Sequence, residues 1–248
     1  MFIAKPKSIE KIDYSGYPPR NVVVAGATGL VGREIIRLLE ERPNANFTAL
    51  VRRPGCLGDI SGRVREVVFD YEDQVHYGKI GVDFPCDVFL CALGATIKKA
   101  GSPEAFRTVD LEYPSRLFGR LVQLSPRPML GVVSSVGAGR PSGLYLKTKH
   151  GMEQRLLGSG LPHLIVRPSL ILGEREDVRP LELVSAGLLK PYRALISMLA
   201  PRNEFLWRIA PIEAVKIASA LVWICVDEPP FEESRILEGL ALHHPIMR

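Results

Sequence analysis

The sequence is poor in cysteine and has no paired thiol motif. Its four cysteines stand at positions 56, 86, 91 and 225, and no two of them form a CxxC pair. A disulfide-stapled secreted domain or a structural zinc site needs such pairs, and the five histidines also lack metal-ligand spacing. We therefore expect free thiols, no bound metal, and a protein of the reducing cytoplasm.

Long apolar runs and a strong charge bias are missing as well. The longest apolar stretch, at 217–226, is too short to cross a bilayer, and the chain start lacks the apolar core of a secretory signal peptide. Lys and Arg number 32 against 27 Asp and Glu, which leaves a net charge of +5 over 248 residues. That surplus suits an anionic small molecule and is too scattered for nucleic acid. We expect neither a membrane nor a nucleic acid as partner.

Short β-branched runs alternate with helical periodicity over the first 170 residues, and the pattern after that is mostly helical. Alternating strands and helices form right-handed crossovers and a parallel sheet. We expect an α/β fold with a doubly wound parallel sheet in a single domain, 1–248. An N-terminal arm covers 1–19, and a small helical lobe on the substrate side covers about 171–248. The predicted strands are 21–25, 47–51, 64–69, 88–93, 129–134 and 164–166; the predicted helices are 31–41, 104–124, 144–157, 181–188, 192–199 and 212–226.

A glycine-rich turn follows the first predicted strand and opens an amphipathic helix. Gly26, Gly29 and Gly32 have GxxGxxG spacing. In a dinucleotide-binding turn one glycine permits the tight bend, another lets the backbone approach a pyrophosphate, and another lets the helix pack on the strand. The helix N-terminus then offers N–H groups to phosphate. In this context the motif predicts a Rossmann fold that binds a dinucleotide.

Two adjacent arginines, Arg52 and Arg53, follow the second predicted strand, about 20 residues after the turn. An acidic residue here selects NAD through the ribose 2′-OH, whereas a cation accommodates the 2′-phosphate of NADP. Because the arginine fork matches phosphate oxygens, the pair predicts NADP(H) in preference to NAD(H). Asp70 ends the third predicted strand and is a candidate acceptor for the adenine amino group or a cap of the next helix.

A serine, a tyrosine and a lysine form a candidate proton-transfer set. Ser134 and Ser135 end the fifth predicted strand, and Tyr145 and Lys149 follow four positions apart, which places both on one face of a helix. A nearby ammonium lowers the pKa of a tyrosine, whose free value is about 10. Tyr145 could then exchange a proton with a carbonyl oxygen, and Ser135 could donate a hydrogen bond to the same oxygen.

These motifs together resemble the atypical branch of the short-chain dehydrogenase/reductase superfamily. Several segments are similar to one subfamily, the Tat-interacting-protein-like oxidoreductases. The segments are CALGATIKKAGS (91–102), FRTVDLEYP (106–114), VVSSVGAG (132–139), YLKTK (145–149) and IVRPSLILGEREDVRP (165–180).

The resemblance implies a Rossmann fold that binds NADPH and assigns roles to residues that match the family pattern. Lys149 would also hold the ribose hydroxyls. The implied pyrophosphate positions are Gly26, Thr28, Gly29, Leu30, Val31 and Gly32; Arg52 and Arg53 face the 2′-phosphate and Asp70 the adenine; Leu93 and Gly94 line the path to the nicotinamide, Pro168 and Leu170 flank it, and Ser135, Tyr145 and Lys149 are catalytic.

One position departs from the family. Many members carry an asparagine on the helix before the fifth strand that anchors a proton-relay water, and this chain offers Asp110 instead. The leading hypothesis is an NADPH-dependent oxidoreductase of a small carbonyl or alcohol. The alternatives are a non-catalytic NADPH-binding redox sensor that acts through a regulatory protein partner, and an isomerase that uses the cofactor transiently. The sequence leaves a homodimer open, and it disfavours a cysteine-dependent acyl dehydrogenase because Cys86 and Cys91 lie in or beside a buried strand.

Overall fold

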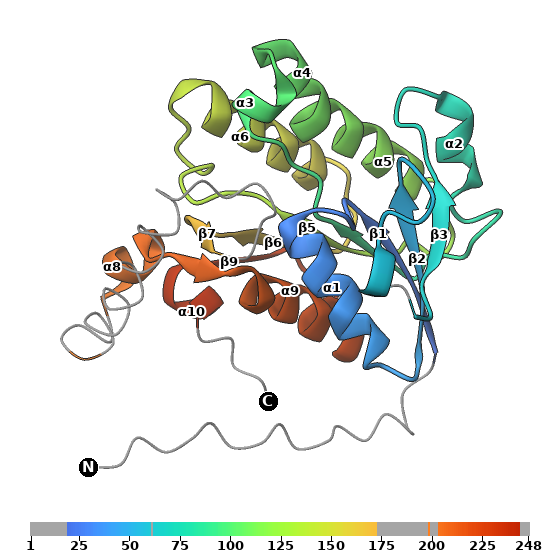
Figure 1. Cartoon of the computed structure of the whole chain (residues 1–248). Helices are drawn as coiled ribbons and strands as arrows, with labels where there is room; N and C mark the ends of the chain where they lie inside the picture. The colour runs from blue at the N-terminus through green and yellow to red at the C-terminus, as the bar shows by residue number, and fades with distance from the viewer. Residues whose placement is uncertain (1–18, 61, 173–197, 199–202, 244–248) are drawn as a thin grey trace.

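A seven-stranded sheet forms the centre of the protein, seen in a computed structural model that describes residues 19–60, 62–172, 198 and 203–243 (Figure 1). Its strands run in the order β3-β2-β1-β4-β5-β6-β9, and every neighbouring pair is parallel. A separate parallel pair joins β7 to β8. The bounds are β1 (Arg20–Ala25), β2 (Ala45–Val51), β3 (Arg65–Val68), β4 (Val88–Cys91), β5 (Met129–Val133), β6 (His163–Arg167), β7 (Ile171–Leu172), β8 (Ile212–Glu213) and β9 (Arg235–Glu238).

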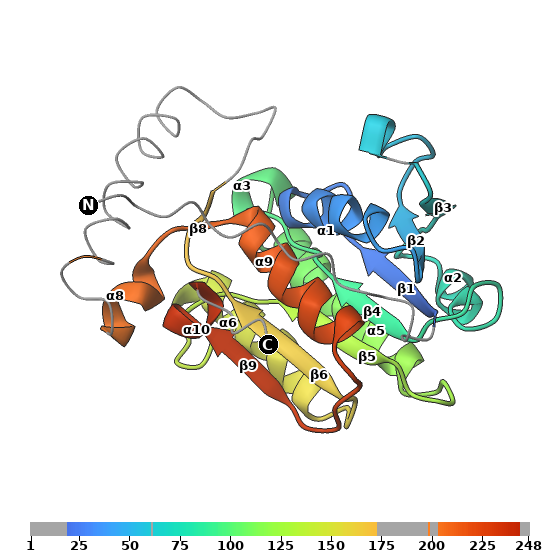
Figure 2. The ribbon, with the colours of Figure 1, turned by 90° about the horizontal axis from the view of Figure 1, so that it is seen from below.

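Helices cover both faces of the sheet. On one face α1 (Leu30–Glu40) lies beside α9 (Ala214–Val222), as Figure 2 shows, and on the other face α5 (Tyr113–Leu121) lies beside α6 (Gly143–Leu157). The shorter elements are η1 (Gly58–Ile60), α2 (Gln74–Lys79), α3 (Ile97–Ala100), α4 (Pro103–Arg107), η2 (Thr108–Glu112), α8 (Glu204–Ile209), η3 (Trp223–Asp227) and α10 (Gly239–His243). No described helix has the length and apolar character to cross a bilayer.

The central strand β1 shows why this sheet needs two layers of helices. Val22 and Val24 pack into the core under α1 and α9, whereas Val23 and Ala25 pack into the core under α5 and α6. All four side chains are almost completely buried. Because successive strand residues point to opposite faces, a strand covered on both sides is apolar at every position. The unbroken apolar run that predicted this strand therefore has a direct structural cause.

The α/β fold and its six predicted strands are confirmed, and the predicted helix over 104–124 is present as α4, η2 and α5 in succession. The C-terminal part differs from the mostly helical prediction, because β9 adds a seventh strand beside β6. The helix predicted over 212–226 begins at Ala214 as α9 and ends in the π-type turn η3. The predictions at 1–18, 181–188 and 192–199 lie outside the described residues, apart from Met198.

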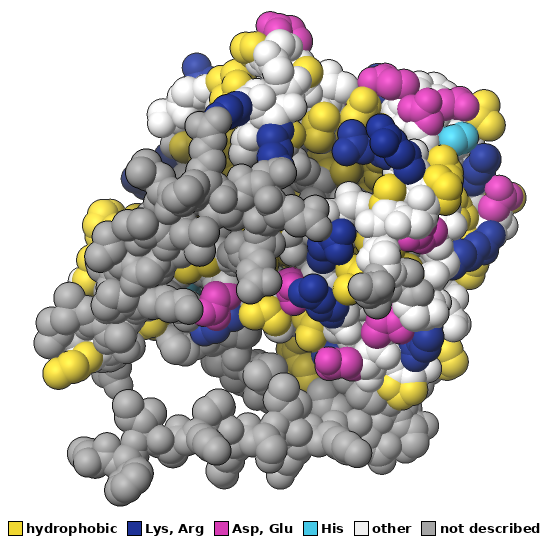
Figure 3. All heavy atoms as spheres, in the orientation of Figure 1, with side chains coloured by type: hydrophobic (Ala, Val, Ile, Leu, Met, Phe, Trp, Pro, Cys, Tyr) yellow, Lys and Arg dark blue, Asp and Glu magenta, His cyan; other side chains and the backbone are white. Residues whose placement is uncertain are grey.

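The strand order defines where a ligand can bind. β1 pairs with β2 on one side and with β4 on the other, so the chain reverses direction across the sheet between them. In open parallel sheets, ligands bind at such a switch point, beyond the carboxyl ends of the strands. On the face seen in Figure 3, Lys and Arg side chains are interspersed with acidic and apolar ones. The edge beyond the carboxyl ends of β1 and β4 is therefore the expected position of a ligand site.

Candidate functional site

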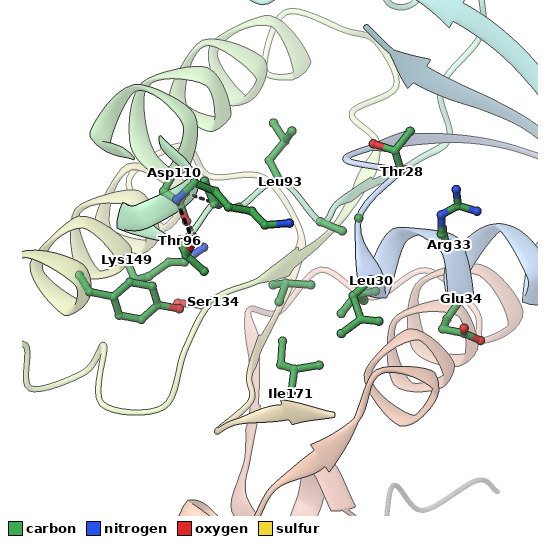
Figure 4. A pocket seen from close by; sticks show the side chains of 18 of the residues that line it. Thr28, Leu30, Arg33, Glu34, Leu93, Thr96, Asp110, Ser134, Lys149 and Ile171 are labelled. Carbon is green, nitrogen blue, oxygen red and sulfur yellow. Dashed lines mark hydrogen bonds and ion pairs between the residues drawn. The ribbon is translucent and has the colours of Figure 1, made fainter. Parts of the chain in front are cut away.

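A groove with a volume of about 840 Å³ lies at the carboxyl edge of β1, β4 and β5 (Figure 4). Asp110 and Lys149 stand toward one end of it, and Arg33 and Glu34 of α1 toward the other. The lining residues are Thr28, Gly29, Leu30, Val31, Arg33, Glu34, Arg37, Ala92, Leu93, Gly94, Ala95, Thr96, Lys99, Asp110, Val133, Ser134, Tyr145, Lys149 and Ile171.

The glycine turn has no room for side chains at two of its three positions. Gly26 has a φ of 81°, and a Cβ there would lie 2.6 Å from the carbonyl group of Ala92 at the end of β4. A Cβ on Gly32 would lie 2.1 Å from the carbonyl oxygen of Gly26. Gly29 closes the turn, since its N–H donates to that same oxygen at 3.0 Å. The glycines therefore let β1, β4 and α1 approach one another around the groove, as predicted for a dinucleotide turn.

The first turn of α1 is left open to a ligand. No side chain among the described residues caps this N-terminus, and no acidic residue stands in the first turn. Thr28, Leu30 and Val31 line the groove beside it. Helix N-termini have unsatisfied N–H groups and a positive dipole end. An anionic group in the groove would accept hydrogen bonds from these N–H groups and interact favourably with the positive dipole end.

A buried ion pair forms one wall of the groove. The Nζ atom of Lys149 lies 2.7 Å from Oδ1 of Asp110, and both side chains are at most 5% exposed. The other carboxylate oxygen of Asp110 accepts a hydrogen bond from the N–H of Ala95 at 2.7 Å. Burial alone lowers the pKa of Lys149, but Asp110 and Tyr145 counter it, so the pKa lies above its ordinary value. Lys149 is therefore a buried ammonium at neutral pH.

Tyr145 stands one helical turn before Lys149 on α6, and both side chains line the groove. The ring of Tyr145 stacks on Phe106 with centroids 5.6 Å apart and an interplanar angle of 25°. Phe106 itself is completely buried, whereas Tyr145 is 39% exposed. The ring is thus held on one face by the core and remains accessible to a molecule in the groove.

The two serines that follow β5 lie differently with respect to the groove. Ser134 lines the groove, is 3% exposed, and its Oγ has no hydrogen-bond partner among the described atoms. Ser135 is outside the lining, and its Oγ donates to the carbonyl of Val136 at 3.4 Å. A buried hydroxyl without a partner is costly, so a ligand oxygen in the groove is its natural partner.

The predicted adenosine-side residues stand at neighbouring strand ends, outside the groove lining. Arg52 and Arg53 are exposed just after β2, and neither guanidinium makes a hydrogen bond or ion pair with another described residue. Asp70 follows β3, its carboxylate accepts from the N–H of Glu72 at 2.9 Å, and its own N–H donates to Nδ1 of His76 at 2.7 Å. The arginines are therefore available to a ligand, while Asp70 also stabilises the turn that leads to α2.

Of the four residues predicted near the nicotinamide, two line the groove and two do not. Leu93 and Gly94 line the groove. Pro168 is buried outside it, where its carbonyl accepts from Val136 at 2.9 Å. Leu170 is 57% exposed and lies outside the lining, and the next residue, Ile171 on β7, lines the groove instead.

Sequence reasoning missed the charged side chains of α1 and α3. Arg33, Glu34 and Arg37 form the outward face of α1, and Lys99 belongs to α3. Arg37 is paired with Glu34 one turn earlier, whereas the guanidinium of Arg33 has no ion-pair partner among the described residues. On an amphipathic helix such residues form the polar stripe whether they face solvent or a groove, so no sequence signal distinguishes the two.

Three of the four cysteines are buried thiols rather than activated nucleophiles. All four are free thiols, and Cys86, Cys91 and Cys225 are buried. Burial raises the pKa of each of these three, that of Cys91 to about 11. Since the thiolate is the nucleophile, a cysteine-dependent reaction at these positions is disfavoured. Within the described ranges, no three His, Cys, Asp or Glu side chains gather as metal ligands.

Two fungal proteins are among the relatives of the chain. It is 33% identical over 161 residues to the protein FMP52, mitochondrial, of Candida albicans, which covers 62% of this chain and 68% of that protein. It is also 33% identical over 159 residues to the protein of the same name from Eremothecium gossypii, covering 63% and 68%. The expectation of a cytoplasmic protein is therefore wrong, because these relatives are named mitochondrial. Free cysteines, on which that expectation rested in part, do not distinguish the cytoplasm from other reducing compartments.

Solved structures share the fold at lower sequence identity. A putative epimerase from Burkholderia cenocepacia superposes with a TM-score of 0.65 at 18% identity, over 91% of this chain and 78% of that one. A short-chain dehydrogenase/reductase family oxidoreductase from Burkholderia thailandensis gives 0.60 at 17% identity, over 90% and 92%. Both likenesses concern the fold.

A family model described as NAD(P)H-binding matches residues 26–189, which is more than half of the chain. The match begins at the first glycine of the turn and includes Tyr145 and Lys149. It agrees with the Rossmann sheet and with the resemblance to the atypical short-chain dehydrogenases/reductases. The chain belongs to the NAD(P)H-binding family that this model describes.

Proposed function

We propose that the protein is an NADPH-dependent oxidoreductase that transfers hydride between the cofactor and a small carbonyl or alcohol. The observation that carries this proposal is the shared groove: Tyr145 and the ammonium of Lys149 open onto the same cavity as the glycine turn. A dinucleotide bound at the turn would extend toward the tyrosine. A nucleotide-binding module without chemistry needs the turn but has no use for this pair.

The groove fits a dinucleotide on its own features. The N-terminus of α1, which no described side chain caps, offers N–H groups to the pyrophosphate, and Gly26 and Gly32 let β1, β4 and α1 approach one another closely beside it. Arg52 and Arg53, exposed beyond β2, are suited to the 2′-phosphate, which favours NADP(H) over NAD(H). The guanidinium of Arg33, which has no ion-pair partner in the described part of the chain, adds positive charge beside the pyrophosphate position.

When bound, a reduced nicotinamide supplies a hydride to the carbonyl carbon. Tyr145 gives the proton of its hydroxyl to the carbonyl oxygen, so the carbonyl becomes an alcohol, and the reverse reaction returns the proton to Tyr145. Ser134 donates a hydrogen bond to the same oxygen through its hydroxyl, which has no other partner among the described atoms. Lys149 presents its ammonium to the ribose hydroxyls and to Tyr145.

The test is NADPH and NADH oxidation by the purified protein with a panel of aldehydes, ketones and quinones. We expect turnover with at least one carbonyl class and a preference for NADPH. Tight NADPH binding without turnover on any of them would favour the alternative role as a sensor that acts through a protein partner. Equal use of both cofactors would contradict the role given to Arg52 and Arg53.

We also propose that the protein resides in mitochondria. The support is the name shared by the fungal relatives, each of which is called mitochondrial. Subcellular fractionation of cells that express the full chain with a C-terminal tag tests this. Recovery of the tag with the cytosolic fraction would refute it.

A further inference from the structure

We infer that Asp110 is a positioning residue of the site. Its two carboxylate oxygens hold the ammonium of Lys149 and the loop after β4 in one arrangement. The inference rests on the proposed function for its catalytic consequence. The contacts of Asp110 with Lys149 and Ala95 do not depend on that function. Figure 4 shows the pair at one end of the groove, where Asp110 and Lys149 point toward each other from two different helical elements.

Both oxygens of Asp110 are engaged. Oδ1 lies 2.7 Å from Nζ of Lys149, and Oδ2 accepts from the N–H of Ala95 at 2.7 Å. A carboxylate accepts at both oxygens, whereas an asparagine accepts at one and carries donors at the other. An asparagine at this position could keep the bond to Ala95, but it would then turn its NH₂ group toward the ammonium. Only an ionised acid serves both partners.

The surroundings leave the pair little freedom. Asp110 lies in the π-type segment η2, between α4 and α5, and its side chain is fully buried. A π-type segment is rare, and such segments occur frequently at functional sites. Gly94 covers the pair, since a Cβ there would lie 3.5 Å from Oδ1 of Asp110 and 3.6 Å from Nζ of Lys149. The loop that borders the cofactor groove is thereby joined to the residue that neutralises Lys149.

The groups that face Lys149 make Asp110 its decisive partner. These are Asp110 from η2, Tyr145 from its own helix and Cys91 from β4. Burial raises the pKa of Cys91 to about 11, so its thiol is neutral at physiological pH. A buried ammonium that loses the one ionised partner it has among the described residues favours the uncharged amine. Without the carboxylate, Lys149 should therefore lose its proton at a lower pH.

The direct test follows the titration of Lys149 by NMR in protein with ¹³C-labelled lysine, without cofactor, in wild type and Asp110→Asn. Assignment uses Lys149→Arg. We expect the Lys149 signal to titrate at least ~1 pH unit lower in Asp110→Asn. The matched control is Asp83→Asn, which removes an exposed carboxylate outside the groove lining and should leave the signal unchanged. An unchanged Lys149 titration in Asp110→Asn would overturn the inference.

A second measurement tests the inference if Asp110→Asn does not fold. The double variant Asp110→Leu with Lys149→Leu removes both charges and leaves no buried ion unpaired. We expect its thermal midpoint to lie above that of either single leucine variant. A double variant that is less stable than both single variants would overturn the inference as well.

Activity supplies a readout that a merely structural residue would not move. In wild type and Asp110→Asn, kcat/KM is measured across pH with the best carbonyl of the panel. We expect the alkaline limb to shift to lower pH in the variant, while Asp110→Glu, which keeps the charge, retains part of the wild-type profile. If wild type shows no turnover, the proposed function fails and the NMR result still decides the role of Asp110. If turnover is present and the alkaline limb does not shift, the catalytic part of the inference fails.

Discussion

The close approach at Gly32 makes a sharp prediction about the substitution Gly32→Ala. Its Cβ would lie 2.1 Å from the carbonyl oxygen of Gly26 and 2.7 Å from Cα of Ala27, and neither backbone atom can move without shifting β1 or α1. Overpacking of this kind costs about 1–3 kcal/mol, and contact with backbone belongs at the upper end of that range. Alanine recovers about 1 kcal/mol of helix propensity. We expect a net loss of about 2 kcal/mol in the free energy of unfolding.

The matched control is Gly119→Ala on α5. Gly119 is exposed and helical, and its Cβ would meet nothing within 4 Å. This substitution gains the propensity without the overlap, so it should stabilise the protein by about 1 kcal/mol. In a chain of this size 1 kcal/mol moves the thermal midpoint by roughly 2–4 °C. The two glycine-to-alanine changes should therefore shift the midpoint in opposite directions.

Thermal unfolding followed by circular dichroism and NADPH titration followed by nicotinamide fluorescence check the prediction together. Gly32→Ala should lower the midpoint and weaken NADPH binding by ~10-fold or more, since the turn must open to accept the methyl group. Gly119→Ala should bind NADPH as wild type does. A Gly32→Ala protein that is as stable as wild type and binds NADPH equally well would refute the reasoning about the turn.

Two further predictions concern the arginines that follow β2 and the serines that follow β5. Replacing Arg52 and Arg53 together by Ala should weaken NADPH binding by ~10-fold or more and leave NADH binding within a few-fold. The reason is that charge-assisted hydrogen bonds of about 1.5–3 kcal/mol to the 2′-phosphate are lost, and NADH has no such phosphate. Titrations with both nucleotides check this, and equal losses for both would count against it. Ser134→Ala should lower kcat by ~10-fold or more at little cost to NADPH affinity, whereas Ser135→Ala should keep a kcat near that of wild type. A larger loss of kcat in Ser135→Ala than in Ser134→Ala would support the role predicted for Ser135 from the sequence.

The features that the sequence predicts well are encoded by neighbours along the chain. The GxxGxxG spacing predicts the turn because the three glycines act within one bend and one helix start. Tyr145 and Lys149 are predicted to share a face because four residues are close to one helical turn. Apolar runs predict buried parallel strands because each residue of such a strand contacts one core or the other. In each of these three cases the residues that define the feature lie close together in the sequence, so the pattern can be recognised without knowledge of the fold.

The features that it predicts poorly depend on contacts between distant segments. β9 has four residues and pairs with β6 in the register Leu164 with Arg235, a partner that its own sequence cannot reveal. The ion pair between Asp110 and Lys149 likewise joins two elements that are distant in the sequence. The choice between Ser134 and Ser135 depends on which of two adjacent residues turns into the groove where β5 ends. A one-residue shift at a strand end reverses that choice.

The central claim is that Tyr145 transfers a proton in a groove that binds NADPH, and Tyr145→Phe tests it most directly. Phenylalanine keeps the ring that stacks on Phe106 and removes only the hydroxyl. The measurement is kcat/KM of the variant relative to wild type on the best carbonyl of the panel, with NADPH affinity determined in the same preparation. We predict a loss of ~10²–10⁴-fold in kcat/KM with NADPH affinity within a few-fold of wild type. A variant that turns over at the wild-type rate would contradict the account.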